Sequence, residues 1–333
     1  MGTPEFAVPT LRRLVEDGHD IVCVFTQPDR AAGRGRKISP PPVKTAALEL
    51  GLAVEQPPRV SAPGVVEAIR RMSPDVAVVA AFGQKISPEL LSVPKHGFVN
   101  VHPSLLPRYR GAAPVERCLM NCDEVTGVTI MYMDEGWDTG DIGLVRTVCV
   151  PAGASAGEVE ACLAEHGAEL MREFLRLLDK GTAPRVAQDH LQATYAPKIT
   201  EADRCVDFRM PAVAVEHYVR GLSPDPCALA SVGGVRFKIL RARALPEWSP
   251  GSTEGAGSSD ASPTASPGML WPHRRLGLVV GCGADGRDGL VLEEVQPAGG
   301  KRMGGAEFAR GRRICHGQAL DVLSSLDSGE GSA

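Results

Sequence analysis

Three polar side chains in the first half of the sequence could together act on a carbonyl group. Asn100 and His102 end an apolar run that starts at Phe98, and Asp138 lies in the later stretch Met-Asp-Glu-Gly-Trp-Asp-Thr-Gly-Asp. An amide and an imidazolium can both donate to an oxygen that becomes anionic, and a nearby carboxylate favours the charged imidazole. We expect these three residues to form one catalytic site.

The elements around these residues should bring them together. A strand over residues 98–101 would place Asn100 and His102 on one face, since side chains alternate along a strand. Pro103 should end that strand at the carboxyl edge of the sheet. The composition of residues 103–114 then predicts an ordered loop that forms one side of a pocket. Asp138 follows a second expected strand, residues 128–133. A histidine considered alone at a strand end is more often a structural hydrogen-bonding group.

Alternating apolar runs and helical patterns predict a parallel sheet covered by helices in the first half. Expected strands are residues 21–25, 76–82, 98–101, 128–133 and 144–150, and a helix begins at Ser155 and ends at Gly181. Short strands at 235–240, 277–280 and 289–295 predict a small β-barrel in the second half. The expected organisation is a catalytic domain over 1–183, a linker over 184–203, a barrel domain over 204–317 and a polar tail over 318–333. Residues 249–268 read as a flexible insertion without a catalytic role.

Composition narrows the class of protein. The 333 residues are 43% hydrophobic and 23% charged, which fits two soluble domains. We expect a cytoplasmic location and no membrane contact, because no run approaches ~20 apolar residues and no signal segment is visible. Nine scattered cysteines predict reduced thiols and no metal site. The net charge is −4, yet residues 204–313 carry +4, which suits either a phosphate-facing surface or an ordinary solvated one.

Residues 98–114, Phe-Val-Asn-Val-His-Pro-Ser-Leu-Leu-Pro-Arg-Tyr-Arg-Gly-Ala-Ala-Pro, resemble the formyltransferase family that uses 10-formyltetrahydrofolate. The resemblance implies a Rossmann-like parallel-sheet formyltransferase domain followed by an OB-like β-barrel domain. It also implies Asn100, His102 and Asp138 as catalytic residues, 10-formyltetrahydrofolate as the formyl-donor cosubstrate, and no metal. Two segments, residues 82–86 and 104–107, should line the folate site. The alternative for residues 82–86 is simple packing at a strand end. Their residues are Phe82, Gly83, Gln84 and Ile86, and Ser104, Leu105, Leu106 and Pro107.

The segment Thr26–Lys44 resembles a loop of those family members that formylate methionine on initiator tRNA, and residues 195–199 and 296–303 resemble the same members. The resemblance implies initiator methionyl-tRNA as partner. We expect a monomer, an expectation that rests on no motif of the sequence. Basic residues of these segments should contact phosphates, although such residues are often only a solvated edge. They are Arg30, Arg34, Arg36, Lys37, Lys198, Lys301 and Arg302. The main alternative is formylation of a nucleotide-linked amino sugar; an RNA-binding module on an inactive scaffold ranks last, because all three catalytic residues are present.

The beginning of the sequence has an unusual feature. Gly2-Thr3-Pro4 is typical of a turn after a first strand. Residues 6–15 are typical of the helix that follows such a turn. Members of the resembled family have several apolar residues before this turn and place that strand centrally in the sheet. A chain without it should be unstable, because two neighbouring strands would expose backbone groups. The numbering could start at an internal methionine, which the intact mass of the natural protein would decide.

Overall fold

The computed structural model describes residues 1–32, 37–248, 250 and 266–321. The chain divides into two compact units, which are described separately. The first comprises residues 1–115, 125–150 and 158–197, and the second comprises residues 116–124, 151–157 and 198 onward. Residues 184–197, expected in a linker, thus belong to the first unit.

The first unit contains a mixed sheet that ends in an antiparallel hairpin. Its order is β5 (Ala77–Val79), β6 (Phe98–His102), β8 (Val125–Tyr132) and β9 (Ile142–Cys149). β5 and β6 are parallel, as expected, whereas β8 is antiparallel to both β6 and β9. The connection between β8 and β9, residues 133–141, is too short for the crossover that parallel neighbours need, so these two strands pair antiparallel.

A second parallel pair, β1 (Val24–Phe25) and β4 (Val54–Glu55), lies beyond β5. Met1 and Gly2 lie between β1 and β5: Gly2 forms a parallel bridge with Ala80 and donates its N–H to the Phe25 carbonyl. Two further short pairs are the antiparallel β2 (Arg30–Ala32) with β3 (Lys37–Ser39), and the parallel β7 (Arg110–Gly111) with β10 (Tyr195–Ala196).

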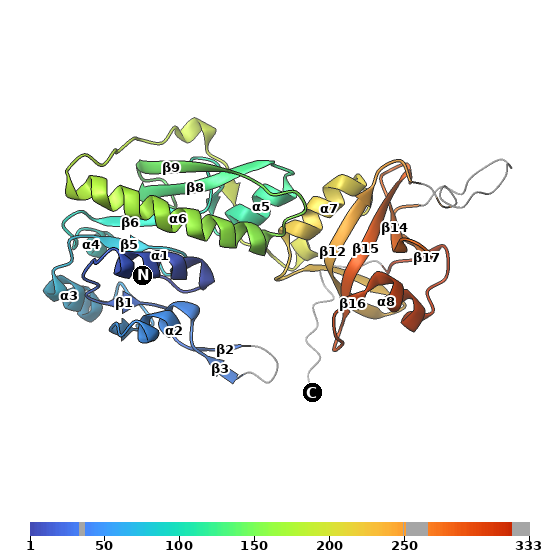
Figure 1. The fold of residues 1–333 in the computed structure, drawn as a ribbon, viewed down its shortest axis with the longest axis horizontal. Coiled ribbons are helices and arrows are strands. Elements are labelled where there is room, and N and C mark those ends of the chain that lie inside the picture. The colour runs from blue at the N-terminus through green and yellow to red at the C-terminus, as the bar shows by residue number, and fades with distance from the viewer. Residues whose placement is uncertain (33–36, 249, 251–265, 322–333) are drawn as a thin grey trace. The chain divides into compact units, whose positions relative to one another are not determined.

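Helix α6 (Ala156–Asp179) lies along the β8–β9 part of the sheet (Figure 1). Val159, Leu163, Leu170 and Phe174 form a buried apolar stripe on this helix, and Leu178 at its end is half-buried. Phe174 packs edge-on against Tyr132 with ring centroids 5.4 Å apart. A Cβ atom at Gly143 of β9 would collide with the Phe174 ring, so glycine allows this close approach. The remaining helices of this unit are η1 (Glu5–Ala7), α1 (Val8–Glu16), α2 (Pro42–Glu49), α3 (Pro63–Met72), α4 (Pro88–Leu91) and η2 (His190–Gln192), and α5 (Pro114–Met120) is shared between the units.

The second unit is built on one antiparallel sheet, which confirms the expected barrel-like domain. The order is β11 (Ala228–Val232), β12 (Val235–Leu245), β15 (Asp288–Pro297), β14 (Gly277–Cys282), β13 (Met269–His273) and β17 (Gln318–Ala319), and β16 (Met303–Gly304) pairs with β15. Irregular register in β12 between Ile239 and Ala242 allows the sheet to curl. Helices α7 (Ala212–Gly221) and α8 (Gly305–Arg312) pack on this sheet, and the short helix η3 (Ala202–Arg204) precedes α7 in the chain. Phe237 and Phe308 pack with tilted rings in the core. No helix within the described ranges is long and apolar enough to cross a membrane.

Candidate active site

His102 lies at the end of β6 and is only 4% exposed. Its Nε2 is 3.0 Å from the Tyr109 carbonyl oxygen, so an Nε2–H would donate to that oxygen. Its Nδ1 is 3.8 Å from Oδ2 of Asp138, which is too far for a hydrogen bond but close enough for charge attraction. The ring is therefore held at one nitrogen and open at the other, on the side that faces the carboxylate.

Asp138 is positioned by its backbone as well as by its side chain. Its φ of 53° lies in the left-handed region, where non-glycine residues are uncommon. Its Oδ2 accepts the Gly111 N–H at 2.8 Å, which joins the Asp138 loop to the loop after β6. A Cβ at Gly111 would lie 2.8 Å from the Ala196 carbonyl oxygen, so only glycine permits this approach of the two chains.

Gln188 supports this loop from a segment that sequence reasoning had expected to be a linker. The side chain is 5% exposed, and its Nε2 donates to the carbonyls of Asp138 (2.9 Å) and Gly140 (2.7 Å). Its Oε1 accepts two hydrogen bonds from Arg110, from Nε at 3.1 Å and from Nη2 at 2.7 Å. All four hydrogen-bonding positions of the amide are thus used, and the amide can take only this orientation.

Arg110 is a buried cation, 2% exposed, whose second contact is from Nη2 to His190 Nδ1 at 3.0 Å. It forms no ion pair with a carboxylate of the described residues. A buried guanidinium without a neutralising partner is costly unless its donors are satisfied, so Gln188 is important to both Arg110 and Asp138. No local sequence pattern predicts this network, because Gln188 lies 50 residues from Asp138 and 78 residues from Arg110 along the chain.

Asn100 lies on β6 two residues before His102, and its side chain is half-buried. Successive positions on one strand face are about 6.6 Å apart, so the two side chains can reach one small group. The structure therefore brings His102 and Asp138 together in space, and the strand places Asn100 beside them.

The first candidate folate segment follows β5. Phe82 and Ile86 are buried in a core cluster with Leu90 and Phe98. The Gln84 side chain joins this segment to another loop, accepting the Val60 N–H at 2.6 Å and donating to the Pro57 carbonyl at 3.0 Å. Gly83, with φ of 79°, makes the turn. These contacts hold the segment against the core and against the loop that contains Pro57 and Val60.

The second candidate folate segment lies next to His102. Ser104 is buried and its hydroxyl donates to the Arg108 carbonyl at 2.7 Å, while the Leu106 N–H donates to Thr129 Oγ1 at 3.2 Å. Leu106 is buried, whereas Leu105 and Pro107 are half-buried. These two are the side chains of the segment with apolar surface left to offer.

The candidate tRNA residues lie in both units, and the structure describes five of the seven. Arg30 is exposed on β2 and donates to Gln27 Oε1 at 3.1 Å. Lys37 belongs to β3, and Arg34 and Arg36 lie outside the described residues. In the second unit Lys198, Lys301 and Arg302 are exposed, the last two just before β16. In the part of the chain that is described, no group of three or more His, Cys, Asp or Glu could hold a metal.

The fold and the site define an α/β transferase unit followed by an antiparallel half-barrel. The family model described as formyl transferase matches residues 1–175, and that of the formyl transferase C-terminal domain matches residues 198–313. Methionyl-tRNA formyltransferase of Geobacter sulfurreducens is 41% identical over 327 residues, covering 98% of this chain and 97% of the relative. That of Symbiobacterium thermophilum is 43% identical over 311 residues, covering 93% and 91%. The chain therefore belongs to the formyl transferase family, within the group of methionyl-tRNA formyltransferases.

Solved structures agree on the fold. The N-formyltransferase of Helicobacter canadensis, in complex with folinic acid and dTDP-3-aminofucose, aligns with a TM-score of 0.64 over 87% of this chain and 97% of its own, at 16% identity. HypX of Aquifex aeolicus, in complex with tetrahydrofolic acid, aligns with a TM-score of 0.56 over 79% of this chain and 43% of its own, at 19% identity. At these identities the likeness establishes the fold alone.

Proposed function

We propose that this protein transfers the formyl group of 10-formyltetrahydrofolate to the α-amino group of methionine on initiator methionyl-tRNA. The product, formylmethionyl-tRNA, would serve translation initiation. The observation that carries the proposal is identity of 41% over 327 residues to a methionyl-tRNA formyltransferase, in a chain that retains Asn100, His102 and Asp138. The 3.8 Å approach of His102 to Asp138 supports a catalytic role for the pair.

The first chemical step is attack of the amine nitrogen on the formyl carbon. A free α-amino group has a pKa of about 7.7 to 8.0, so a useful neutral fraction exists near pH 7 without a strong base. As the new C–N bond forms, the formyl oxygen becomes anionic. We assign Asn100 and the open Nδ1 of His102 as donors to that oxygen, each contributing about 3 to 4 kcal/mol. With Nε2 held by the Tyr109 carbonyl, a ring that is protonated at both nitrogens can satisfy both partners.

The second step expels the folate nitrogen. The bond between the formyl carbon and that nitrogen breaks, its electron pair stays on the nitrogen, and the proton lost by the attacking amine must reach it. We assign Asp138, whose Oδ2 lies 3.8 Å from His102 Nδ1, to take this proton and pass it on. This role needs Asp138 to be held accurately, which its contact with Gly111 and the Gln188 support provide.

We assign the substrate contacts by segment. The backbone of Phe82, Gly83, Gln84 and Ile86, together with Ser104, Leu105, Leu106 and Pro107, forms the proposed folate site. The basic residues Arg30, Arg34, Arg36, Lys37, Lys198, Lys301 and Arg302 form the proposed tRNA contacts. The finer domain limits, 1–183 for catalysis and 204–317 for RNA binding, belong to the same proposal. We also propose that the protein is a monomer, that it is located in the cytoplasm and that the reaction uses no metal.

A competition experiment tests this function. The purified protein receives 10-formyltetrahydrofolate labelled in the formyl group together with three acceptors: charged initiator tRNA, a nucleotide-linked amino sugar and glycinamide ribonucleotide. We expect label on the methionyl-tRNA alone. Label on the amino sugar without label on the tRNA would reject the proposal.

A further inference from the structure

The Phe82 carbonyl, in the first candidate folate segment, accepts hydrogen bonds from two distant parts of the chain. The Thr3 hydroxyl donates to it at 2.8 Å, and the Gln27 side-chain Nε2 donates to it at 3.3 Å. A carbonyl oxygen has two lone pairs, so these two donors satisfy it. The direction of this carbonyl is thus set by side chains from outside its own segment.

The peptide between Phe82 and Gly83 can adopt two orientations. Gly83 has a φ of 79°, in a region that glycine populates about as readily as negative φ. In a trans peptide the N–H points away from the C=O, so the donors that hold the Phe82 carbonyl also set the direction of the Gly83 N–H. Rotation of this peptide would turn away a backbone donor of the proposed folate site.

Gln27 connects this peptide to Arg30 of β2. Its Oε1 accepts a hydrogen bond from Arg30 Nη2 at 3.1 Å, so one amide has Arg30 on its oxygen and Phe82 on its nitrogen. Hydrogen bonds in such a chain strengthen one another, and the donor on this oxygen is a cation. At 3.3 Å the bond from Gln27 is the longer of the two on the carbonyl, so it is the one that strengthening can shorten. Arg30 is exposed, and a guanidinium has five N–H donors, so it can bind a phosphate while Nη2 stays on Gln27.

The backbone that carries Gln27 and Arg30 is held by other contacts. The Gln56 Nε2 donates to the Gln27 carbonyl at 2.8 Å and to Asp29 Oδ1 at 2.7 Å. Lys44 Nζ lies 2.7 Å from Asp29 Oδ2. These contacts involve neither the Gln27 amide nor the Arg30 guanidinium. The segment is therefore fixed without them, and the amide is the direct link from Arg30 to the candidate folate segment.

We propose that Gln27 is a positioning residue, which couples the binding of tRNA at Arg30 to the binding of the formyl donor at the Phe82–Gly83 peptide. The inference rests on the proposed function, which supplies the two ligands and their contacts. A tRNA phosphate on Arg30 immobilises the guanidinium, and the immobilised guanidinium holds the Gln27 amide on the Phe82 carbonyl. Each ligand then improves the binding of the other by the same factor, because coupling between two sites is reciprocal.

Equilibrium binding to the full chain tests this coupling. Uncharged initiator tRNA lacks the methionyl amine, so it can be combined with 10-formyltetrahydrofolate without transfer. We expect saturating tRNA to lower the Kd of 10-formyltetrahydrofolate by roughly threefold to tenfold, which corresponds to one hydrogen bond. The saturating formyl donor should lower the Kd of the tRNA by the same factor. Gln27→Leu, which removes both amide contacts, should leave each Kd independent of the other ligand.

Thr3→Val is the matched control, because it removes the other donor to the same carbonyl and leaves Gln27 and Arg30 in place. It should weaken the binding of the formyl donor to a similar extent with and without tRNA. The coupling factor of the wild type should therefore persist in Thr3→Val and be lost in Gln27→Leu.

The outcomes separate this inference from the function on which it rests. If both ligands bind the wild type and neither changes the Kd of the other, the inference is wrong and the proposed function stands. The same holds if Gln27→Leu keeps the wild-type coupling factor, since the coupling then takes another route. If either ligand fails to bind the wild type, the proposed function and this inference fall together.

Discussion

Replacing Gln188 with glutamate isolates the support of the Asp138 loop from the stability of the fold. The carboxylate would keep the Oε1 contacts to Arg110, which become an ion pair with a buried cation. The oxygen that replaces Nε2 would instead face the carbonyls of Asp138 and Gly140, at positions now 2.9 and 2.7 Å away. Two attractions thus become two repulsions while the Arg110 side is strengthened.

The expected magnitude follows from these contacts. Each lost buried hydrogen bond is worth about 1 to 3 kcal/mol, and repulsion adds to this, so the Asp138 loop should move rather than keep its position. A shift of about 1 Å at a catalytic group can cost 100-fold in rate. We expect Gln188→Glu to lower kcat about 100-fold, with the KM for tRNA within threefold of wild type and the thermal midpoint nearly unchanged.

Steady-state formylation of charged initiator tRNA measures the effect, and pH gives a second readout. The introduced carboxyl group, once protonated, could again donate to one of the two carbonyls, so the ratio of variant to wild-type kcat should rise as the pH falls. Gln192→Glu is the matched control, because it replaces an amide with an acid in the same segment. Gln192 is exposed, and its Nε2 contacts Asp189 instead of the Asp138 loop. Gln188→Glu with kcat within threefold of wild type, or with a ratio independent of pH, would refute the reasoning.

Three further outcomes follow from the structure. His102→Ala and Asp138→Ala should each lower the single-turnover transfer rate by about 100- to 1,000-fold, while each variant still folds and keeps a cooperative thermal transition. A near-normal rate in either variant would reject the catalytic role of the residue that was replaced. The ion pair with Arg117 at 2.8 Å holds the pKa of Asp203 well below its ordinary value. The pair therefore stabilises the fold above that ordinary value and is lost as the pH falls through the lowered one, so the midpoint difference between wild type and Asp203→Asn should shrink in acid; a constant difference would contradict this. Lys301→Ala should weaken tRNA binding and reduce the slope of log affinity against log salt by up to about 1, and an unchanged slope would remove Lys301 from the RNA surface.

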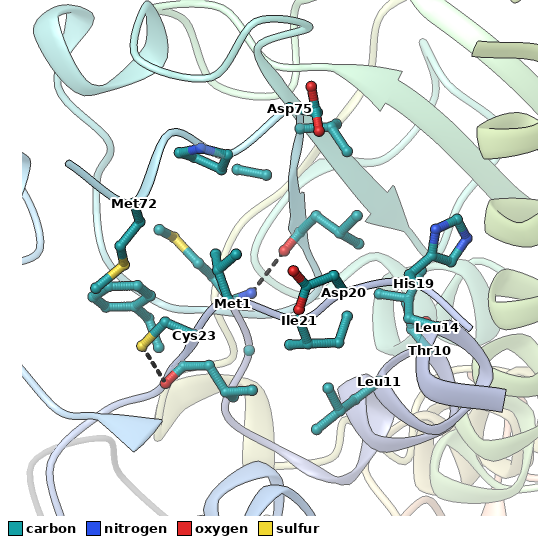
Figure 2. A pocket seen from close by; sticks show the side chains of 18 of the residues that line it. Met1, Thr10, Leu11, Leu14, His19, Asp20, Ile21, Cys23, Met72 and Asp75 are labelled. Atoms are coloured by element: carbon teal, nitrogen blue, oxygen red, sulfur yellow. Dashed lines mark hydrogen bonds between the residues drawn. The ribbon is translucent and has the colours of Figure 1, made fainter. Parts of the chain in front are cut away.

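Strongly periodic and apolar segments could be predicted from the sequence. The helix expected from Ser155 to Gly181 is confirmed as α6 (Ala156–Asp179), because its apolar stripe repeats over many turns. The strand expected at 21–25 is paired only at Val24–Phe25. The physical reason is that pairing needs a partner: residues 21–23 line an open pocket of about 430 Å³ between β1 and β5 (Figure 2), where no neighbouring strand is present among the described residues.

The proposed catalytic residues were predictable in a different way from their support. Asn100 and His102 share a strand, and local alternation was enough to place them on one face. Gln188 reaches Asp138 only through the folded chain, from a segment without periodicity. A buried polar network of this kind is specified by tertiary geometry, which the pattern of a single sequence does not record.

The start of the chain and the candidate folate segment are physically connected. Gly2 bridges Ala80, and the Thr3 hydroxyl donates to the Phe82 carbonyl at 2.8 Å, so residues 2 and 3 hold the segment proposed to contact folate. Thr3→Val removes the hydroxyl at similar volume. We expect it to raise the KM for 10-formyltetrahydrofolate by roughly threefold to tenfold, the equivalent of one hydrogen bond, with less change in the KM for tRNA. Thr3→Ser, which keeps the hydroxyl, is the matched control and should stay near wild type. An unchanged KM for the formyl donor in Thr3→Val would show that this hydrogen bond has no bearing on the folate segment.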